Sequence, residues 1–230
     1  MAILTHSGRA ALAASVKNEV LHLALGRGQP WWDSTAQITA AFDAQGRIAL
    51  PHAPIAQIAV KSANGQTTYA ADQDYAADAQ QGLITRLDTG QIAPGASVRL
   101  EIAYGRPTEN VAATALLDEV CRRTVDEVYF VEPDPNGEIA LATGRYRVSQ
   151  APTQHLFLRT KFDFGDAAGS TIREQAVFVG TQVQAGLPPG QRLFTPAEIA
   201  SPGTLLLLEH APPIVRQAST RETFEFVLTF

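Results

Sequence analysis

The pattern of apolar and polar positions predicts a chain made mostly of short strands, with a few helices. In residues 7–20, apolar side chains recur at helical spacing behind a capping residue, Thr5 or Ser7, which predicts an amphipathic helix. Residues 21–25 then alternate like a half-buried strand and end in a run of turn formers. A second helical pattern covers residues 111–122. We therefore expect a helix near each of these two segments and mainly strands in the rest of the chain.

The remaining apolar runs have the length and alternation of β-strands. They lie at residues 55–60, 66–69, 83–87, 98–104, 125–131, 138–142, 144–148, 156–164, 172–179 and 204–209. In the final run, residues 223–230, the side chains of Phe224, Phe226 and Leu228 fall on one face, which predicts a buried strand that closes the fold. A short helix is expected at residues 196–200, because Thr195 can cap it and a proline follows.

Turn-prone sequence marks the ends of a separate β module. Residues 44–46 and 105–107 are rich in glycine, proline and polar residues, as is typical of the points where an inserted domain joins its host. The predicted fold is mainly β with a few short helices (α+β). Residues 1–45 and 106–230 form its β-sandwich-like core, with the helices near 7–20 and 111–122, and residues 46–105 form a small inserted β domain.

Composition narrows the classes of partner. A chain of 230 residues with 45% hydrophobic residues can bury a core, and a net charge of −5 without clustered basic residues argues against nucleic acid as a partner. A single cysteine, Cys121, excludes an intramolecular disulfide. No apolar run approaches the roughly 20 residues that a membrane helix needs, and the first residues lack the pattern of a signal peptide. We expect no membrane insertion.

Candidate catalytic and metal-binding residues do not form a constellation. Cys121 has no identifiable base partner and is expected to be a small buried thiol. The carboxylates Asp72, Asp74 and Asp78 lack the spacing of a calcium loop and are interpreted as turn caps. The histidines are isolated in the sequence, at His6, His22, His52, His155 and His210. The sequence therefore predicts no enzyme, no metal and no cofactor.

Two pairs of residues are candidates for an interface. Trp31 and Trp32 are adjacent, so in an extended chain they point to opposite faces, and one of them could anchor a partner or plug its own domain. Arg173 and Arg216 could pair with glutamates of a neighbouring strand or of a neighbouring subunit.

Several motifs resemble a family of uncharacterised tail and baseplate proteins of Mu-like tailed bacteriophages. The resemblance covers nearly the whole chain. It is carried by THSGRAA at 5–11, LHLALGRG at 21–28, WD at 32–33, FDFGDAAG at 162–169, TIRE at 171–174, VFVG at 177–180, LFTPAEIASPG at 193–203 and RETFEFVLTF at 221–230.

Two looser resemblances concern parts of the chain. Residues 162–179 are similar to the baseplate-attaching region of tail-collar and tail-fibre proteins. The inserted module resembles a small β unit of many phage tail proteins, through YAADQDY at 69–75, GLITRL at 82–87 and GASV at 95–98. Such proteins often have a glycine in the first of these motifs, where this chain has Ala71 or Asp72.

The resemblance implies a virion structural protein of the tail tip or baseplate, synthesised in the bacterial cytoplasm. Its expected partners are other tail and baseplate proteins, a tail fibre and copies of itself. Host recognition is the alternative: the protein would bind a surface glycan or pilus, with Trp31, Trp32, Tyr69 and Tyr75 as stacking residues. A surface-degrading enzyme would need a carboxylate pair in a cleft, and the sequence offers no such pair.

Overall fold

The computed structural model describes residues 2–230 and divides the chain into two compact units. Unit 1 contains the residues up to Gly28 and those of Glu109–Phe230, and unit 2 is Gln29–Thr108. Both units consist of antiparallel sheets, and one α-helix lies in the described part of the chain, so the predicted mainly β fold is confirmed. Each unit has an apolar core of its own.

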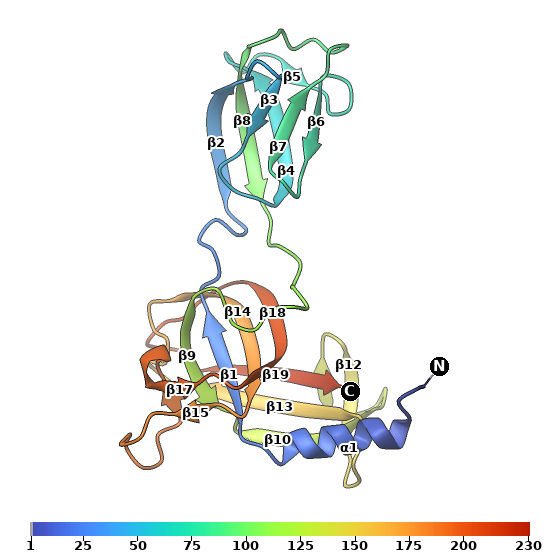
Figure 1. The fold of residues 1–230 in the computed structure, drawn as a ribbon, viewed down its shortest axis with the longest axis vertical. Coiled ribbons are helices and arrows are strands. Elements are labelled where there is room, and N and C mark those ends of the chain that lie inside the picture. The colour runs from blue at the N-terminus through green and yellow to red at the C-terminus, as the bar shows by residue number, and fades with distance from the viewer. Residues whose placement is uncertain (1) are drawn as a thin grey trace. The chain divides into compact units, whose positions relative to one another are not determined.

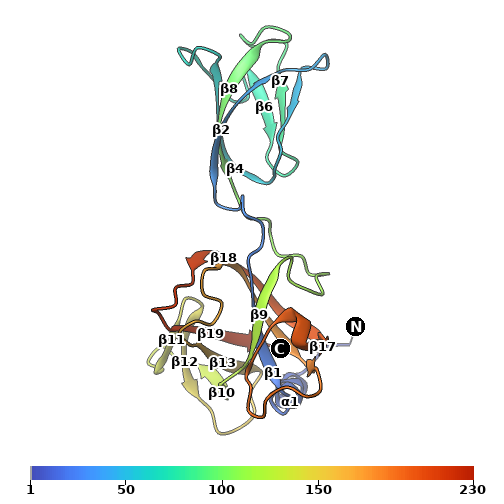
Figure 2. The same ribbon diagram turned by 90° about the vertical axis from the view of Figure 1, so that its left-hand side faces the viewer.

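Unit 1 contains two five-stranded sheets whose strands run crosswise to each other (Figures 1 and 2). The first sheet has the order β16 (Leu193–Phe194), β9 (Glu119–Thr124), β1 (Leu21–Gly26), β14 (Thr171–Val179), β18 (Thr204–Val215). The second has the order β11 (Ile139–Leu141), β12 (Gly144–Val148), β10 (Glu127–Pro133), β13 (His155–Phe162), β19 (Glu222–Thr229). A small two-stranded sheet, β15 (Gln182–Val183) and β17 (Ile199–Ser201), flanks a 3-10 turn at Pro196–Glu198.

The core of unit 1 lies between these two sheets. Strand β1 contributes Leu21, Leu23 and Leu25, and the terminal strand β19 contributes Phe224 and Phe226 among others. Strand β19 pairs with β13 over eight residues, which confirms the predicted closing strand. Every position of β1 is buried, rather than every second one as predicted, because an additional apolar cluster covers the outer face of the first sheet.

The N-terminal helix α1 (His6–Lys17) forms as its sequence predicts. The side-chain oxygen of Thr5 accepts a hydrogen bond from the backbone nitrogen of Gly8, which caps the helix. Ala13 and Val16 lie three residues apart, so they share the face that packs on the core of unit 1. The helix thus covers part of the sandwich.

Unit 2 is a smaller two-layer β structure. Its four-stranded sheet has the order β2 (Thr35–Ala41), β8 (Ser97–Tyr104), β4 (Ile55–Ser62), β5 (Thr68–Tyr69). Its three-stranded sheet has the order β3 (Arg47–Ala49), β7 (Leu83–Arg86), β6 (Tyr75–Asp78). The turns at residues 63–65 and 80–82 join paired strands. Asp72 lies in the turn before β6 and has a positive φ of 62°. It therefore adopts the conformation that a glycine adopts most easily.

The structure moves the first boundary of the inserted unit. The sequence places it at residue 46, whereas the chain divides after Gly28, and the second boundary lies after Thr108 instead of residue 105. The reason is strand β2, which pairs with β8 over seven residues and so belongs to unit 2. Turn-forming residues at 44–46 mark a connection within the unit and not its edge.

The predicted helix at 111–122 is wrong. Residues 119–124 form strand β9, which pairs with β1 on one side and with β16 on the other. Leu116 and Val120 have helical spacing, but Leu116 packs on the outer face of the first sheet and Val120 lies at the edge of the main core. Pairing on both sides of β9 overrides the local pattern.

Candidate functional site

Unit 2 is inserted between two hydrogen-bonded strands of unit 1. Strand β1 leads out of unit 1 and β9 returns to it, and the two strands pair with each other up to Gly26 and Glu119. Just beyond this pair, the backbone nitrogen of Arg27 donates to the carbonyl oxygen of Asp118 at 2.8 Å, and their side chains form an ion pair at 3.2 Å. We call residues 26–28 and 117–119 the neck. Unit 2 therefore occupies the position at which a short hairpin turn could have joined β1 to β9.

A buried carboxylate supports the neck. Glu174 on β14 is only 1% exposed, and its Oε2 accepts the backbone N–H of Leu117 at 3.0 Å. The backbone nitrogens of Asp118 and Gly28 also bind it, while burial raises the pKa of this carboxyl. Gly26 leaves room for it, because a Cβ there would lie 2.8 Å from Oε2. Glu174 thus holds both chain segments of the neck against β14.

An apolar groove separates the outer edges of the two large sheets of unit 1. It has a volume of about 370 Å³ and lies between β18, the last strand of one sheet, and β19, the last strand of the other. Its lining is mainly aliphatic, from Leu205, Leu206, Leu207, Leu208, Val227 and Leu228, with residues 109–111, Ala113 and Thr229 at the rim. We call it the edge groove. Both flanking strands are bound on one side only in residues 2–230.

The strand β18 presents free backbone groups to this groove. The backbone nitrogen of His210 donates to the side chain of Glu109 at 3.0 Å and therefore points away from β14. Backbone groups two residues apart in a strand point to the same side, so those of Leu208 also point outward. Pro212 and Pro213 lack N–H groups and block the other half of the strand. The segment before His210 is thus the part of β18 that can accept another strand.

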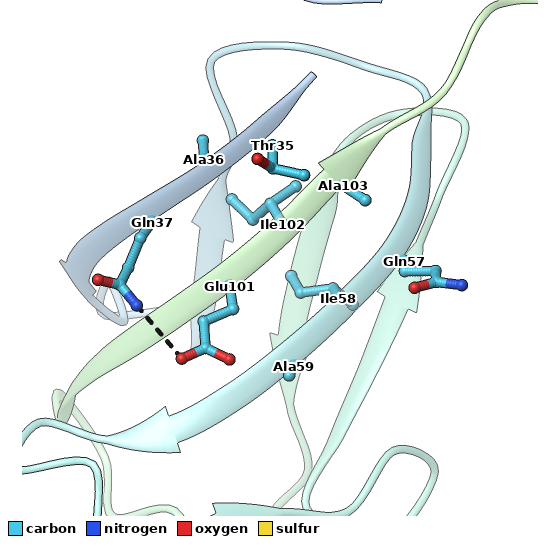
Figure 3. A pocket seen from close by; sticks show the side chains of 9 residues that line it. All are labelled: Thr35, Ala36, Gln37, Gln57, Ile58, Ala59, Glu101, Ile102 and Ala103. Carbon is cyan, nitrogen blue, oxygen red and sulfur yellow. Dashed lines mark hydrogen bonds between the residues drawn. The ribbon is translucent and has the colours of Figure 1, made fainter. Parts of the chain in front are cut away.

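Unit 2 has a shallow polar hollow on the outer face of its four-stranded sheet, with a volume of about 550 Å³ (Figure 3). Glu101 lies in its middle and binds Lys61 at 2.7 Å and Gln37 at 3.2 Å. The hydrogen bond from Lys61 is the main reason why the pKa of Glu101 is lowered. Small side chains, Ala59 and Ala103, leave the sheet surface open around it. This face can receive a flat partner surface.

The two tryptophans do not form an exposed anchor in this structure. Trp32 is 2% exposed. The ring of Trp31 stacks on His52 with centroids 4.1 Å apart, and His52 in turn contacts Tyr104, so Trp31 packs against the core of unit 2. Their arrangement agrees with a plug that covers its own domain.

The two tyrosines proposed as stacking residues also lie within unit 2. Tyr75 is 3% exposed and belongs to the core, while Tyr69 is half-buried against it. The four aromatic candidates therefore do not gather into an exposed stacking platform.

The two arginine candidates bind within unit 1. Arg216 is fully buried and donates to the carbonyl oxygens of Asp163 at 3.0 Å and Asp166 at 3.3 Å. It also forms an ion pair with Glu222 at 3.6 Å. Arg173 is half-buried and donates to the carbonyl oxygen of Arg27 at 3.4 Å. Arg216 thus fixes the loop that follows β13, whereas Arg173 adds a contact at the neck.

A buried polar cluster near β9 was missed by sequence reasoning. Arg122 lies over the ring of Phe178 at 3.7 Å and binds Glu119 at 2.6 Å. His22, on the neighbouring strand, is buried, and desolvation followed by the charge of Arg122 lowers its pKa to about 4. Arg122 gave no sign of this position in the sequence, because Phe178 and His22 are distant from it along the chain and only Glu119 is near.

The remaining titratable side chains serve structural roles in the described residues. In residues 2–230, no group of three His, Cys, Asp or Glu side chains is placed to hold a metal ion. Cys121 is buried as predicted, and burial raises the pKa of its thiol to about 12. Asp74 and Asp78 accept backbone N–H groups at turns, as predicted. Within the described chain, no helix has the length and hydropathy to cross a membrane.

The fold defines a β protein of two units, one inserted in the other. The family model described as "Baseplate wedge 3 tail fiber network component" matches residues 1–75 and 102–230, and the chain belongs to this family. It is also 45% identical over 74 residues, or 31% of the chain, to the tail sheath protein of Burkholderia phage BcepMu, of which the match spans 16%. The protein is thus a structural component of a phage tail and part of the virion.

Proposed function

We propose that the protein is a connector, in which unit 1 docks in the baseplate and unit 2 receives a tail fibre or another tail protein. The observation that supports this most is the insertion of unit 2 between the paired strands β1 and β9. Because each unit has its own core, a partner can bind unit 2 without disturbing the packing of unit 1.

The neck supports the same role. A connector must carry force between two partners, and the neck has two chain segments joined by the Arg27 and Asp118 contacts and held by Glu174. A single linker would carry the load through one chain segment, whereas the neck shares it between two.

The two surfaces differ in the side chains that they present. The hollow on unit 2 has a charged residue, Glu101, in its middle, while most side chains that line the edge groove of unit 1 are aliphatic. Transient contacts are more polar than permanent ones. We therefore assign permanent assembly to unit 1 and the exchangeable contact to unit 2.

Direct recognition of a host glycan or pilus is the alternative function. Glycan binding commonly uses exposed aromatic rings, but Trp32 and Tyr75 are buried and Trp31 stacks on His52. The connector role fits the positions of these side chains better.

The experiment is a phage in which residues 29–108 are replaced by a short glycine-rich turn from Gly28 to Glu109. We expect particles that contain the shortened protein and lack the partner of unit 2, as measured by mass spectrometry and electron microscopy of tails. A second variant tests the same attachment in the full chain. Glu101→Lys changes only the outer face of the four-stranded sheet of unit 2, and it should weaken the attachment of the same partner.

The outcomes separate the two functions. Complete particles that keep all fibres but fail to adsorb to cells would favour host recognition. Particles with every fibre and normal infectivity would contradict both, and a soluble shortened protein that never enters particles would contradict docking through unit 1.

A further inference from the structure

We propose that residues 2–4 of one copy bind as an added strand in the edge groove of a second copy. The proposal goes beyond the connector function, since it concerns contacts between copies and can be tested on the purified protein. It joins two features of unit 1: an aliphatic groove beside an unpaired strand edge, and an exposed apolar segment in extended conformation.

The edge groove defines what its occupant must be. The outward backbone groups of Leu208 need hydrogen-bond partners, which an extended chain supplies. The floor is aliphatic, with Leu206 from one sheet and Val227 from the other. Glu109 is the one charged residue of the lining. A short, extended, apolar segment without acidic residues satisfies all three conditions.

The segment before α1 has this character. Residues 2–4 read Ala-Ile-Leu, and the backbone at Thr5 is extended, with φ of −73° and ψ of 163°. Ile3 is 79% exposed and Leu4 is 50% exposed. In a strand, these neighbours point to opposite faces, so one can pack towards each sheet that flanks the groove.

The first turn of α1 fixes the point from which the segment extends. Thr5 caps α1 through the backbone nitrogen of Gly8 at 3.1 Å. Leu4 lies against Gly8, because a Cβ at that glycine would be 3.0 Å from its Cδ1. Ile3, one residue further from the helix, is more exposed than Leu4. A second copy can therefore approach Ile3 without disturbing the cap.

Charge supports the same pairing. Arg9 follows the segment by one helical turn and has no carboxylate partner among the described residues. Glu109 lines the groove and Glu209 lies exposed on β18 beside it. The basic end of α1 would therefore meet an acidic rim.

The contact would be heterologous, because the segment and the groove are different surfaces of the chain. Repetition of such a contact produces a ring or an open filament rather than a closed pair. Copies arranged around a symmetric tail can use it at every position.

Sedimentation velocity of the full chain tests the proposal. We expect concentration-dependent association, which Ile3→Asp or Val111→Asp weakens by roughly tenfold to hundredfold. Val111 is fully exposed at the groove rim, so its substitution should spare the fold. The control is Val20→Asp, at another exposed apolar position, which should associate like the wild type. A wild type that stays monomeric, or a control that loses association equally, would overturn the proposal.

Mixing the variants tests the geometry. One copy with an intact segment and one with an intact groove still form a single contact, so Ile3→Asp and Val111→Asp should be monomers alone and a one-to-one dimer together. Failure to form this dimer would overturn the assignment.

A disulfide test distinguishes the second copy from the same copy. Ile3→Cys mixed with Val111→Cys should give crosslinked dimers on oxidation, and Cys121 should not interfere because it is buried. If the chain carrying both cysteines forms only an internal bridge at every concentration, the segment occupies its own groove and the proposal fails.

Discussion

The carboxylate of Glu174 accepts the backbone N–H of Leu117 at 3.0 Å, which ties strand β14 to the chain that returns from unit 2. These residues are far apart in the sequence, and the carboxylate is buried although Leu117 itself is exposed. The stability of the neck therefore depends on a residue outside both of its chain segments.

Replacing Glu174 by alanine should lower the free energy of unfolding of unit 1 by about 3 kcal/mol, because the buried N–H groups that it binds would lose their acceptor. Glu174→Gln keeps one acceptor oxygen and should lose about half as much. Urea denaturation of both variants measures the difference. An alanine variant as stable as the wild type would show that the neck does not rely on this carboxylate.

Gly26→Ala should destabilise unit 1 by about 2 kcal/mol, since the new Cβ would lie 2.8 Å from the Glu174 carboxylate and 3.2 Å from the Asp118 carbonyl oxygen. Gly105→Ala is the matched control, because the nearest atom to its Cβ would be at an ordinary 3.5 Å. Thermal melting of the two variants provides the comparison, and equal melting temperatures would contradict the proposed crowding.

His22 should make the protein less stable as the pH falls. Its pKa is 6.5 in the unfolded chain and about 4 in the folded protein, so between these values the unfolded chain binds more protons. Stability is therefore fully present above 6.5 and decreases as the pH falls to about 4, by about 3 kcal/mol at most.

The measurement is the free energy of unfolding across this pH range for the wild type and His22→Gln. The difference between their pH profiles isolates the histidine from the carboxylates that titrate nearby. His6→Gln is the control at an exposed position. If the wild type and His22→Gln have parallel profiles, the imidazole does not stay neutral in the fold.

Loss of the terminal strand should prevent folding of unit 1. Phe224 packs edge-on against Phe162 with centroids 5.5 Å apart, and Phe224→Ala should cost about 3 to 4 kcal/mol. The control Thr223→Ala alters an exposed neighbour on the same strand and should have little effect. Deletion of residues 223–230 should give insoluble protein, and a soluble truncated chain with unchanged melting would contradict this.

The sequence predicted correctly the helices and strands whose determining residues lie within one short segment. Helix α1 has both its cap, Thr5, and its apolar stripe in one short segment. Strand β19 alternates because one of its faces is buried. The helix predicted at 111–122 was wrong because Leu116 and Val120 have helical spacing by chance. Backbone pairing with β1 and β16 instead makes residues 119–124 a strand.

The features of the neck and the groove could not be predicted in the same way. Glu174 and Arg216 look like surface charges in the sequence, and their partners become visible only when distant strands meet. The edge groove arises where the last strands of two sheets, β18 and β19, lie near each other, which depends on strand order. The aliphatic residues 205–208 were the one sign of the groove in the sequence, but the same run is equally typical of a strand buried in a core.

The insertion between β1 and β9 also determines how tension would enter unit 1. A pull on unit 2 acts on the same end of both strands, so it does not unzip their shared ladder. Tension directed along β1 would load it in shear against β14, where six residue pairs resist together. Both chain ends of the insertion are therefore anchored in the sheet by strands that are paired on two sides.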